Sequence, residues 1–290
     1  MSVAGGLPFA VARAHAHRCE ALQIFTKNAS QWRARPLPPD EIAEFRAATE
    51  KTGIHPVVAH ASYLINIATT NTALRAQSIA ALGEEVDRAE LLGLLGVVLH
   101  PGARMMAPVA QAIELIADAL GQVINARPKG KTMILLEHTA GQGTTMGSTF
   151  EEIAGMLDLA KNRRRLGVCL DTCHLLASGY DLCSSEGYDK TFATFEKLIG
   201  IDRLKVFHLN DSKKPCQSRV DRHEHIGKGC IGVEPFRRLL NDPRFAHLPM
   251  LIETEKTESR TRGKGLVEVD PLDEMNLNTL RSLRAREFSE

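Results

Sequence analysis

Short apolar runs alternate with longer amphipathic segments through most of this 290-residue chain. The short runs are rich in valine, isoleucine and leucine, which is typical of buried β-strands. We expect strands at residues 21–26, 55–59, 96–100, 132–137, 166–171, 204–209 and 248–253. Helical periodicity predicts helices between them at residues 39–49, 72–95, 109–126, 150–164 and 188–198.

This alternation of strand and helix predicts an α/β fold with a parallel sheet. Seven strands in one chain of this length fit a TIM (β/α)8 barrel better than an open sheet, so we expect one domain over residues 1–290. Only the segment Ser2-Val3-Ala4-Gly5-Gly6 precedes the first helix, so the first barrel strand is expected to be truncated. The polar segment 256–265 predicts a surface loop after the last strand.

Composition indicates a globular protein, with 43% hydrophobic and 24% charged residues. The chain has neither an apolar run of about 18 residues nor the pattern of a signal peptide, so we expect a cytoplasmic protein without a membrane span. The six cysteines are scattered and are expected to be reduced thiols. Cys169 and Cys173 lie in an apolar run and are interpreted as buried structural thiols rather than ligands.

The net charge of +1 does not by itself indicate a nucleic-acid partner. Basic residues do cluster locally, at Lys27 with Arg33 and Arg35, at Lys213-Lys214, and at Arg219 with Arg222. Each cluster taken alone is more typical of a solvated surface than of a phosphate contact. Charge therefore leaves the partner undecided.

Six successive predicted strands, from the second to the seventh, each end in a histidine or a carboxylate. These residues are His60, His100, Glu137, Asp171, His208 and Glu253, and His174 follows Asp171 by three positions. In a barrel the carboxyl ends of the strands surround one mouth, so these side chains should converge. One such residue is most simply a hydrogen-bonded structural group, but six together would be costly to bury without metal cations to compensate them. The pattern predicts a metal site.

The loop DRHEHIGKG, residues 221–229, adds Asp221 and His223 in a D-x-H arrangement, close enough to share one metal. His225 is either a third ligand or a neighbour, and we favour the neighbour. The candidate ligands are then nine: His60, His100, Glu137, Asp171, His174, His208, Asp221, His223 and Glu253. Since a catalytic zinc uses about three protein ligands, the set predicts two or three metals. Its imidazole content favours zinc, with manganese or iron open, and clustered metals are typical of phosphate-ester hydrolysis.

Several segments carry a specific resemblance. They are IFTKNASQWRARPL, HASYLIN, LHPG, LEHTAGQG, GVCLDTCHLLASGYD, HLNDSKK, SRVDRHEHIGKG and LIETE. In these segments, and across nearly its whole length, the chain resembles bacterial endonuclease IV, the zinc-dependent abasic-site endonuclease also called deoxyribonuclease IV. The resemblance implies a xylose isomerase-like barrel and a monomer without a nucleotide cofactor.

The resemblance also implies how the nine candidates divide among three zinc ions, one or more of which manganese can replace. His60, His100 and Glu137 hold the first; Glu137 bridges to a second held by Asp171, His208 and Glu253; His174, Asp221 and His223 hold the third. Glu137 is therefore the expected catalytic residue.

The implied activity is hydrolysis of the phosphodiester 5′ to an abasic site in double-stranded DNA, leaving a 3′-hydroxyl, together with trimming of blocked 3′ ends. The family flips the abasic sugar out of the duplex, which costs less where no base pair must be broken. Tyr63 and Leu64 match the inserted residues, and Gln31, Trp32 and Arg222 are the other expected DNA contacts. Ordinary loop packing, and a core position for Trp32, are the alternatives.

The chain departs from the family pattern at two single residues. His138 stands where an asparagine commonly follows the bridging glutamate, and Ser30 stands where some members carry an arginine. The first change lies beside the metal ligands and the second predicts a weaker grip on DNA.

Two other functions compete with this interpretation. A sugar isomerase or epimerase of the same barrel type would hold one or two metals mainly by carboxylates. The six histidines of the site region, counting His225, and the D-x-H loop disfavour it. A metal-stabilised barrel that only binds DNA would need a closed metal site. Loss of activity on chelation, with DNA binding retained, separates the enzyme from such a binder.

Overall fold

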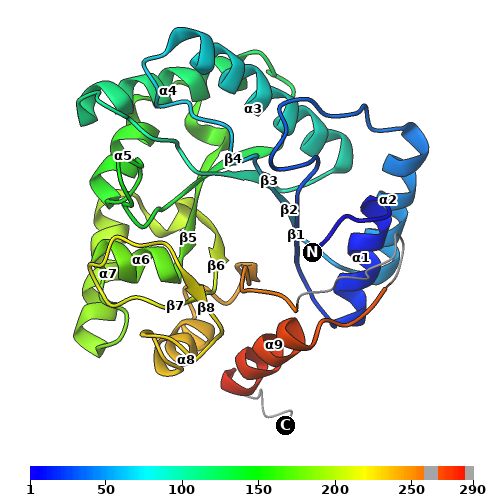
Figure 1. Cartoon of the computed structure of the whole chain (residues 1–290), viewed down its shortest axis with the longest axis vertical. Coiled ribbons are helices and arrows are strands. Elements are labelled where there is room, and N and C mark those ends of the chain that lie inside the picture. The colour runs from blue at the N-terminus through cyan, green and yellow to red at the C-terminus, as the bar shows by residue number, and fades with distance from the viewer. Residues whose placement is uncertain (258–266, 285–290) are drawn as a thin grey trace.

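Seven parallel strands form the central sheet in the computed structural model, which describes residues 1–257 and 267–284. They are β1 (Leu22–Ile24), β2 (Val57–His60), β3 (Gly96–Leu99), β4 (Met133–Glu137), β5 (Leu166–Asp171), β6 (Leu204–His208) and β9 (Met250–Leu251). Their order in the sheet is their order in the chain, β1-β2-β3-β4-β5-β6-β9. The sheet curves into a nearly closed barrel (Figure 1), and each of the seven predicted strands is confirmed.

Helices surround the ring of strands on the outside (Figure 1). They are α1 (Leu7–Ala16), α2 (Pro39–Thr52), α3 (Thr72–Leu92), α4 (Val109–Asn125), α5 (Phe150–Leu159), α6 (Thr172–Ser178), α7 (Ser185–Leu198), α8 (Glu234–Asn241) and α9 (Pro271–Leu283), with short 3-10 turns at Arg163–Arg165 and Ile201–Arg203. The five predicted helices are present, and their ends follow local capping. Gly93, at φ 74°, ends α3, and the hydroxyl of Thr149 accepts from Glu152 N at the start of α5.

The barrel interior and the space between sheet and helices are packed separately. The larger apolar cluster lies between the strands and the helices and includes Phe45, Phe150, Phe192 and Phe207, all about 1% exposed or less. A smaller cluster fills the barrel itself and takes one side chain from each of six strands. Because parallel strands are covered on both faces, they appear in the sequence as continuous apolar runs.

The edges of the sheet are β1 and β9. Residues 1–6 form no strand, and the amino group of Met1 donates to the carbonyl oxygen of Gln23 at 2.7 Å. Within the described residues the barrel therefore has seven strands. This agrees with the expected truncation of the first barrel strand. The predicted loop at 256–265 falls mostly outside the described residues. No helix in the described part of the chain has the length and apolarity needed to cross a membrane.

A two-stranded antiparallel hairpin was not predicted. It pairs β7 (Asp211–Ser212) with β8 (His223–Glu224) and lies beside α6 and α8 (Figure 1). Its strands are only two residues long, too short to produce a recognisable alternation in the sequence. The segment between its strands, residues 213–222, packs on α6, where Gln217 N donates to Leu176 O at 3.0 Å and Arg219 N donates to Ala177 O at 2.9 Å.

Candidate metal centre

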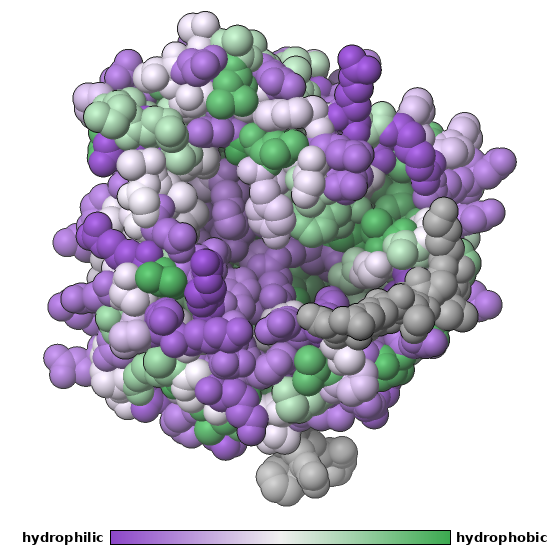
Figure 2. Space-filling view, viewed as in Figure 1, coloured by the Kyte–Doolittle hydropathy of each residue, from purple (hydrophilic) through white to green (hydrophobic). Residues whose placement is uncertain are grey.

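The strand periodicity itself carries the predicted ligands into the barrel mouth. The interior apolar layer consists of Val58, Val98, Leu135, Cys169, Val206 and Leu251. Side chains two positions apart on a strand face the same side of the sheet. The residue two positions after each member of this layer therefore also faces inward, at the carboxyl end of its strand. Those side chains are His60, His100, Glu137, Asp171, His208 and Glu253. Figure 2 shows the result as a hollow lined mainly by hydrophilic residues.

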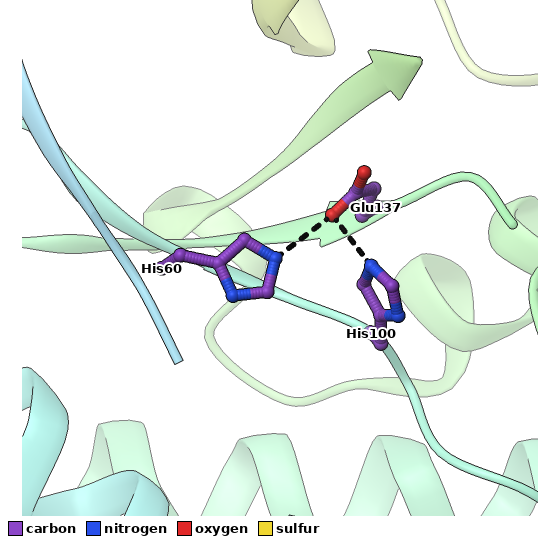
Figure 3. Close-up of side chains that lie close together, drawn as sticks. All are labelled: His60, His100 and Glu137. Carbon is purple, nitrogen blue, oxygen red and sulfur yellow. Dashed lines mark hydrogen bonds and ion pairs between the residues drawn. The ribbon is translucent and has the colours of Figure 1, made fainter. Parts of the chain in front are cut away.

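Glu137 stands at the centre of this arrangement and is fully buried. Its Oε2 atom lies 3.2 Å from Nε2 of His60 and 2.9 Å from Nε2 of His100, as Figure 3 shows. Its other oxygen, Oε1, lies 3.0 Å from Nδ1 of His208. One carboxylate thus faces two different groups of imidazoles with its two oxygens.

A second group forms around His208. Its Nδ1 atom lies 3.1 Å from Oε2 of Glu253 and 3.9 Å from Oδ2 of Asp171. The donor atoms of Glu137, Asp171, His208 and Glu253 all lie within 4.8 Å of one another. These four residues match the second predicted set.

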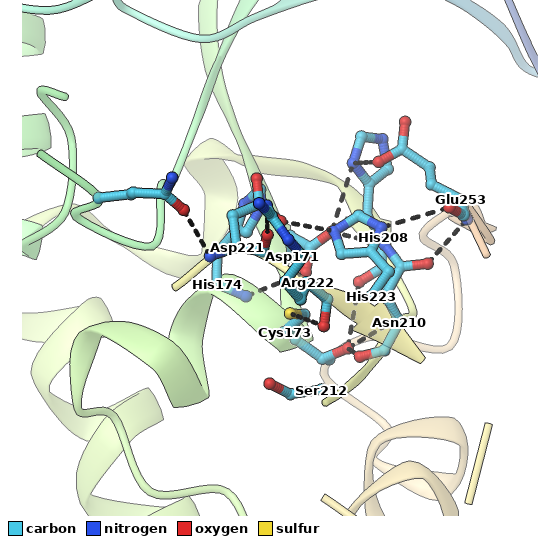
Figure 4. A network of polar contacts seen from close by, with 12 residues as sticks. Asp171, Cys173, His174, His208, Asn210, Ser212, Asp221, Arg222, His223 and Glu253 are labelled. Atoms are coloured by element: carbon cyan, nitrogen blue, oxygen red, sulfur yellow. Dashed lines mark hydrogen bonds and ion pairs between the residues drawn. The ribbon is translucent and has the colours of Figure 1, made fainter. Parts of the chain in front are cut away.

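The third group lies over the β7–β8 hairpin (Figure 4). Asp221 places Oδ2 3.1 Å from Nε2 of His174 and Oδ1 3.3 Å from Nε2 of His223. Both Nε2 atoms are buried, and neither has a hydrogen bond of proper geometry among the described residues. Two orphaned buried imidazole nitrogens beside a carboxylate are what a metal ion would satisfy. Asp171 also belongs here, since its donor atoms group with those of His174 and His223.

Four of the histidines are oriented by backbone or amide oxygens. His60 Nδ1 lies 2.7 Å from Ala61 O, His174 Nδ1 2.8 Å from His138 O, His223 Nδ1 3.2 Å from Glu253 O, and His208 Nε2 2.9 Å from Gln23 Oε1. When a metal binds, a ring N–H donated to these oxygens would leave the other nitrogen, which faces the centre, available as a ligand. Metal-binding histidines are usually held in this way.

Charge is balanced in the centre by the imidazoles. Burial opposes ionisation of Glu137, yet the neighbouring His100 and His208 hold the pKa of its carboxyl well below its usual range. Burial alone would lower the pKa of His174, but the carboxylates of Asp171 and Asp221 raise it to about 10. Protonated imidazoles stabilise the negative charge of these carboxylates, and a divalent cation would stabilise the same charge. The donor set therefore fits metal ions.

Three residues that sequence reasoning missed support this centre. Asn210 donates from Nδ2 to Asp171 Oδ2 at 2.6 Å and accepts from Glu253 N at 2.7 Å. Gln23 donates to Glu253 Oε1 at 2.5 Å. Asn210 lies in the segment HLNDSKK directly after β6, which was a usable signal, whereas Gln23 lies inside β1 with no distinguishing context.

Asp211 is the third missed residue. Its buried carboxylate accepts the backbone N–H groups of Ser212 at 2.7 Å, Gly229 at 3.0 Å and Ile231 at 2.8 Å. These bonds tie the 226–232 segment to the hairpin that carries His223. Asp211 therefore shapes the loop rather than facing the centre.

The predicted neighbour role of His225 agrees with its position. Its Nδ1 atom pairs with Asn276 at 3.0 Å, and it takes no part in the ligand groups. Cys169 and Cys173 are fully buried, and burial raises the pKa of each thiol to about 12. Both lie beside possible ligands, but Cys173 directs its thiol to the carbonyl oxygen of Arg222 at 3.7 Å. The described residues contain no disulfide.

The expected DNA contacts lie on the loops above the centre, with one exception. Tyr63 is 62% exposed, and its ring centroid lies 5.2 Å from that of His60 and 6.0 Å from that of His100. Gln31 and Arg222 are exposed, and Leu64 is half-buried. Trp32 packs against the main apolar core, in line with the alternative interpretation of this residue.

Comparison with known proteins gives matches along nearly the whole chain. A family model described as xylose isomerase-like TIM barrel matches residues 11–273. A protein of Chloroflexus aurantiacus named probable endonuclease 4 is 49% identical over 98% of this chain and 96% of its own. Another of that name, from Geobacter sulfurreducens, is 46% identical over 99% of this chain and 93% of its own.

Solved structures match in the same way. The crystal structure of endonuclease IV from Thermus thermophilus has a TM-score of 0.83 and 35% identity, with 98% of this chain and 96% of that chain covered. A D-tagatose 3-epimerase-like protein matches with a TM-score of 0.70 but 17% identity, over 93% of this chain and 90% of that one. The second likeness shows the fold alone.

Proposed function

Because this chain belongs to the endonuclease IV family of xylose isomerase-like TIM barrels, we propose that it is a zinc-dependent hydrolase that cuts the phosphodiester 5′ to abasic sites in double-stranded DNA. The observation that carries the proposal is Glu137, whose two carboxylate oxygens face two separate imidazole groups at 2.9–3.2 Å. A carboxylate so placed is suited to bridge two metals. Metal pairs about 3.5–4 Å apart are typical of phosphodiester hydrolysis.

The nine ionisable residues divide into three metal sites under this proposal. Glu137 joins His60 and His100 in the first and Asp171, His208 and Glu253 in the second, while His174, Asp221 and His223 form the third. When bound there, the metals would supply a water-derived nucleophile near neutral pH and would neutralise the charge on the phosphate. Zinc fits the imidazole-rich donors best, and manganese can replace it in part.

The protein's own residues position the reaction. Backbone carbonyl oxygens and the Gln23 amide oxygen hold four of the five imidazoles, those of His60, His174, His208 and His223, in the tautomer that binds metal. The apolar layer below the mouth closes the floor, so the phosphate can approach only from the loop side. Asp211 fixes the loop behind His223, which keeps the third site in register with the first two.

Substrate selection is assigned to the loops. Tyr63 stands over His60 and His100, where a side chain can fill the space left by a flipped abasic sugar, and Leu64 follows it. Arg222 and Gln31 are exposed for contacts with the backbone, and Trp32 would contribute by holding its loop rather than by touching DNA. We further propose that blocked 3′ ends of DNA are trimmed at the same centre, and that the protein acts as a monomer.

A sugar epimerase is the second candidate, because barrels of that class share the fold. The donor set disfavours it, since five imidazoles face the centre beside four carboxylates. The identity to named endonucleases, 46–49% over nearly the full length, points the same way.

Cleavage of a labelled duplex with one abasic analogue, beside an intact duplex, tests the proposal when metal content is measured on the same sample. We expect incision 5′ to the lesion and about three zinc ions per chain. Chelation should abolish cleavage, and added zinc should restore it. A metal-loaded protein that leaves the lesion intact would contradict the proposal and favour the epimerase, whose test is turnover of a ketohexose.

A further inference from the structure

The loop after β3 carries two large apolar side chains in open solvent. Met106 is 95% exposed and Met105 is 56% exposed. Single exposed apolar residues are ordinary, but two adjacent ones make a local apolar patch. Hydrogen bonds between Asn66 and Ala103 join their loop to the loop that carries Tyr63, which is 62% exposed. Neither methionine is used in the reaction described above.

The two methionines form the tip of a hydrogen-bonded turn. Ala107 N donates to Arg104 O at 2.9 Å, and the Arg104 side chain donates to Ala107 O at 2.8 Å. Met105 lies at the tip with φ 55°, a left-handed conformation that costs a non-glycine residue about 1 kcal/mol. Strain of this kind persists where the surroundings enforce it and often marks a functional position.

Polar clamps, rather than apolar packing, enforce the turn. Asn66 donates to Ala103 O at 3.0 Å and accepts from Ala103 N at 3.1 Å. Gly102 allows this approach, because a Cβ there would lie 2.3 Å from Asn66 Oδ1. On the other side Arg104 N donates to Thr144 O at 3.0 Å. The tip is thus held out from the surface by the loops on both sides.

These clamps place the turn within the rim of the metal centre. Asn66 belongs to the loop that carries Tyr63, and Tyr63 contacts the rings of His60 and His100. On the other side the loop that holds Arg104 also holds Asp221, whose N–H donates to Gln142 Oε1 at 3.0 Å. The rim is therefore continuous from Tyr63, through the methionine turn, to a predicted metal ligand.

The chemistry of the rim matches a DNA duplex. Exposed cations follow it, with Arg219 beside Gly141 and Arg222 next to Asp221. Cations of this kind contact phosphates, and methionine is among the apolar side chains that proteins press into the minor groove between base steps. From this we infer that Met105 and Met106 form a second apolar contact with the duplex, beside the abasic nucleotide and separate from the Tyr63–Leu64 pair. The inference rests on the proposed function, since it takes that duplex as the substrate.

Steady-state cleavage of an abasic duplex by the double variant Met105→Gln/Met106→Gln tests it. Glutamine keeps the length of methionine and removes its apolar character. We expect KM to rise about tenfold, equivalent to ~1.4 kcal/mol of binding, with kcat within about twofold of wild type. Metal content and the thermal unfolding midpoint should stay unchanged, which a structural role for the turn would not allow.

Leu159→Gln is the matched control, because Leu159 is 58% exposed at the end of α5, outside the rim. Its KM should equal that of wild type. If the double variant keeps the wild-type KM, or if Leu159→Gln raises KM as much, the inference is wrong while the proposed function stands. If the wild-type protein itself does not cleave the abasic duplex, the proposed function and the inference fail together.

Discussion

Oε1 of Gln23 lies 2.9 Å from Nε2 of His208, which joins two residues 185 positions apart in the sequence. Gln23 belongs to β1, one edge of the sheet, while His208 ends β6, next to the other edge strand. The amide therefore spans the open side of the barrel. By accepting from Nε2 it leaves Nδ1 of His208 directed at Glu137 and Glu253.

Gln23→Leu should weaken metal binding at the second site. Leucine fills a similar volume but cannot orient His208 or donate to Glu253, and loss of such an outer partner typically costs about 10–100-fold in metal affinity or activity. Zinc retained against a competing chelator measures the effect. Gln122→Leu on the exposed face of α4 is the control, and equal zinc retention in both variants would show that Gln23 does not position the ligands.

Glu137→Ala should lose cleavage while the fold survives. The substitution removes the one carboxylate that faces both imidazole groups, and we expect a loss of more than about 100-fold, beyond what removing an outer partner costs. The apolar layer beneath it is untouched, so circular dichroism should show the native barrel. Glu114→Ala, an exposed glutamate on α4, should cut normally. Normal cutting by Glu137→Ala would remove the bridging role assigned to this residue.

Tyr63→Ala should impair recognition of abasic DNA more than metal content. Tyr63 makes ring contacts with Phe25, His60 and His100, so the ring rather than the hydroxyl should matter. Loss of one stacking ring costs about 1–3 kcal/mol, or roughly 5- to 150-fold in affinity for the abasic duplex. Tyr63→Phe should retain most of it. A Phe variant as weak as the Ala variant would assign the effect to the hydroxyl instead.

His138→Asn should make the protein less sensitive to acid. His138 is fully buried, and burial, with a smaller effect of His174, lowers its pKa from 6.5 to about 3. Because the pKa of His138 is lower in the folded state than in the unfolded state, the unfolded chain becomes protonated at this residue at a higher pH. This residue's contribution to stability is therefore present above about pH 6.5 and is lost as the pH falls toward 3.

The variant should lose about 2 kcal/mol less stability than wild type between pH 7 and pH 5. Urea unfolding at the two pH values gives the change in the free energy of unfolding for each protein. A loss of stability that the substitution causes equally at both pH values cancels in this comparison. His15→Asn, which replaces an exposed histidine of α1, is the control. Parallel pH profiles for wild type and His138→Asn would show that His138 is not buried as a neutral ring.

The strands and six of the candidate ligands could be predicted because both follow from the same two-residue period. Apolar runs such as the one before Glu137 indicate a strand buried on both faces, and the last inward position of each strand opens into the barrel mouth. His60 and His100 lie two residues beyond Val58 and Val98 for this reason. Local sequence and generic barrel geometry are sufficient for these residues.

The remaining parts of the centre depend on contacts that no local pattern encodes. Asp221 and His223 reach the site through a hairpin with two-residue strands, and the sequence pointed to them through a motif and a family resemblance rather than through periodicity. Gln23 resembles an ordinary polar residue of a strand until folding brings it against His208 and Glu253, and the position of Asn210 after β6 does not by itself show that it bonds Asp171 and Glu253.

The sequence by itself thus determined the strands, the barrel type and the kinds of side chain that end the strands, because these depend on patterns within single segments. Only the tertiary structure decided which oxygen of Glu137 faces which imidazole, which nitrogen of each histidine is free, and that Met105 and Met106 stand in the rim. Such details arise from packing and hydrogen bonds between segments far apart in the chain, so they exist only once the barrel has closed around them.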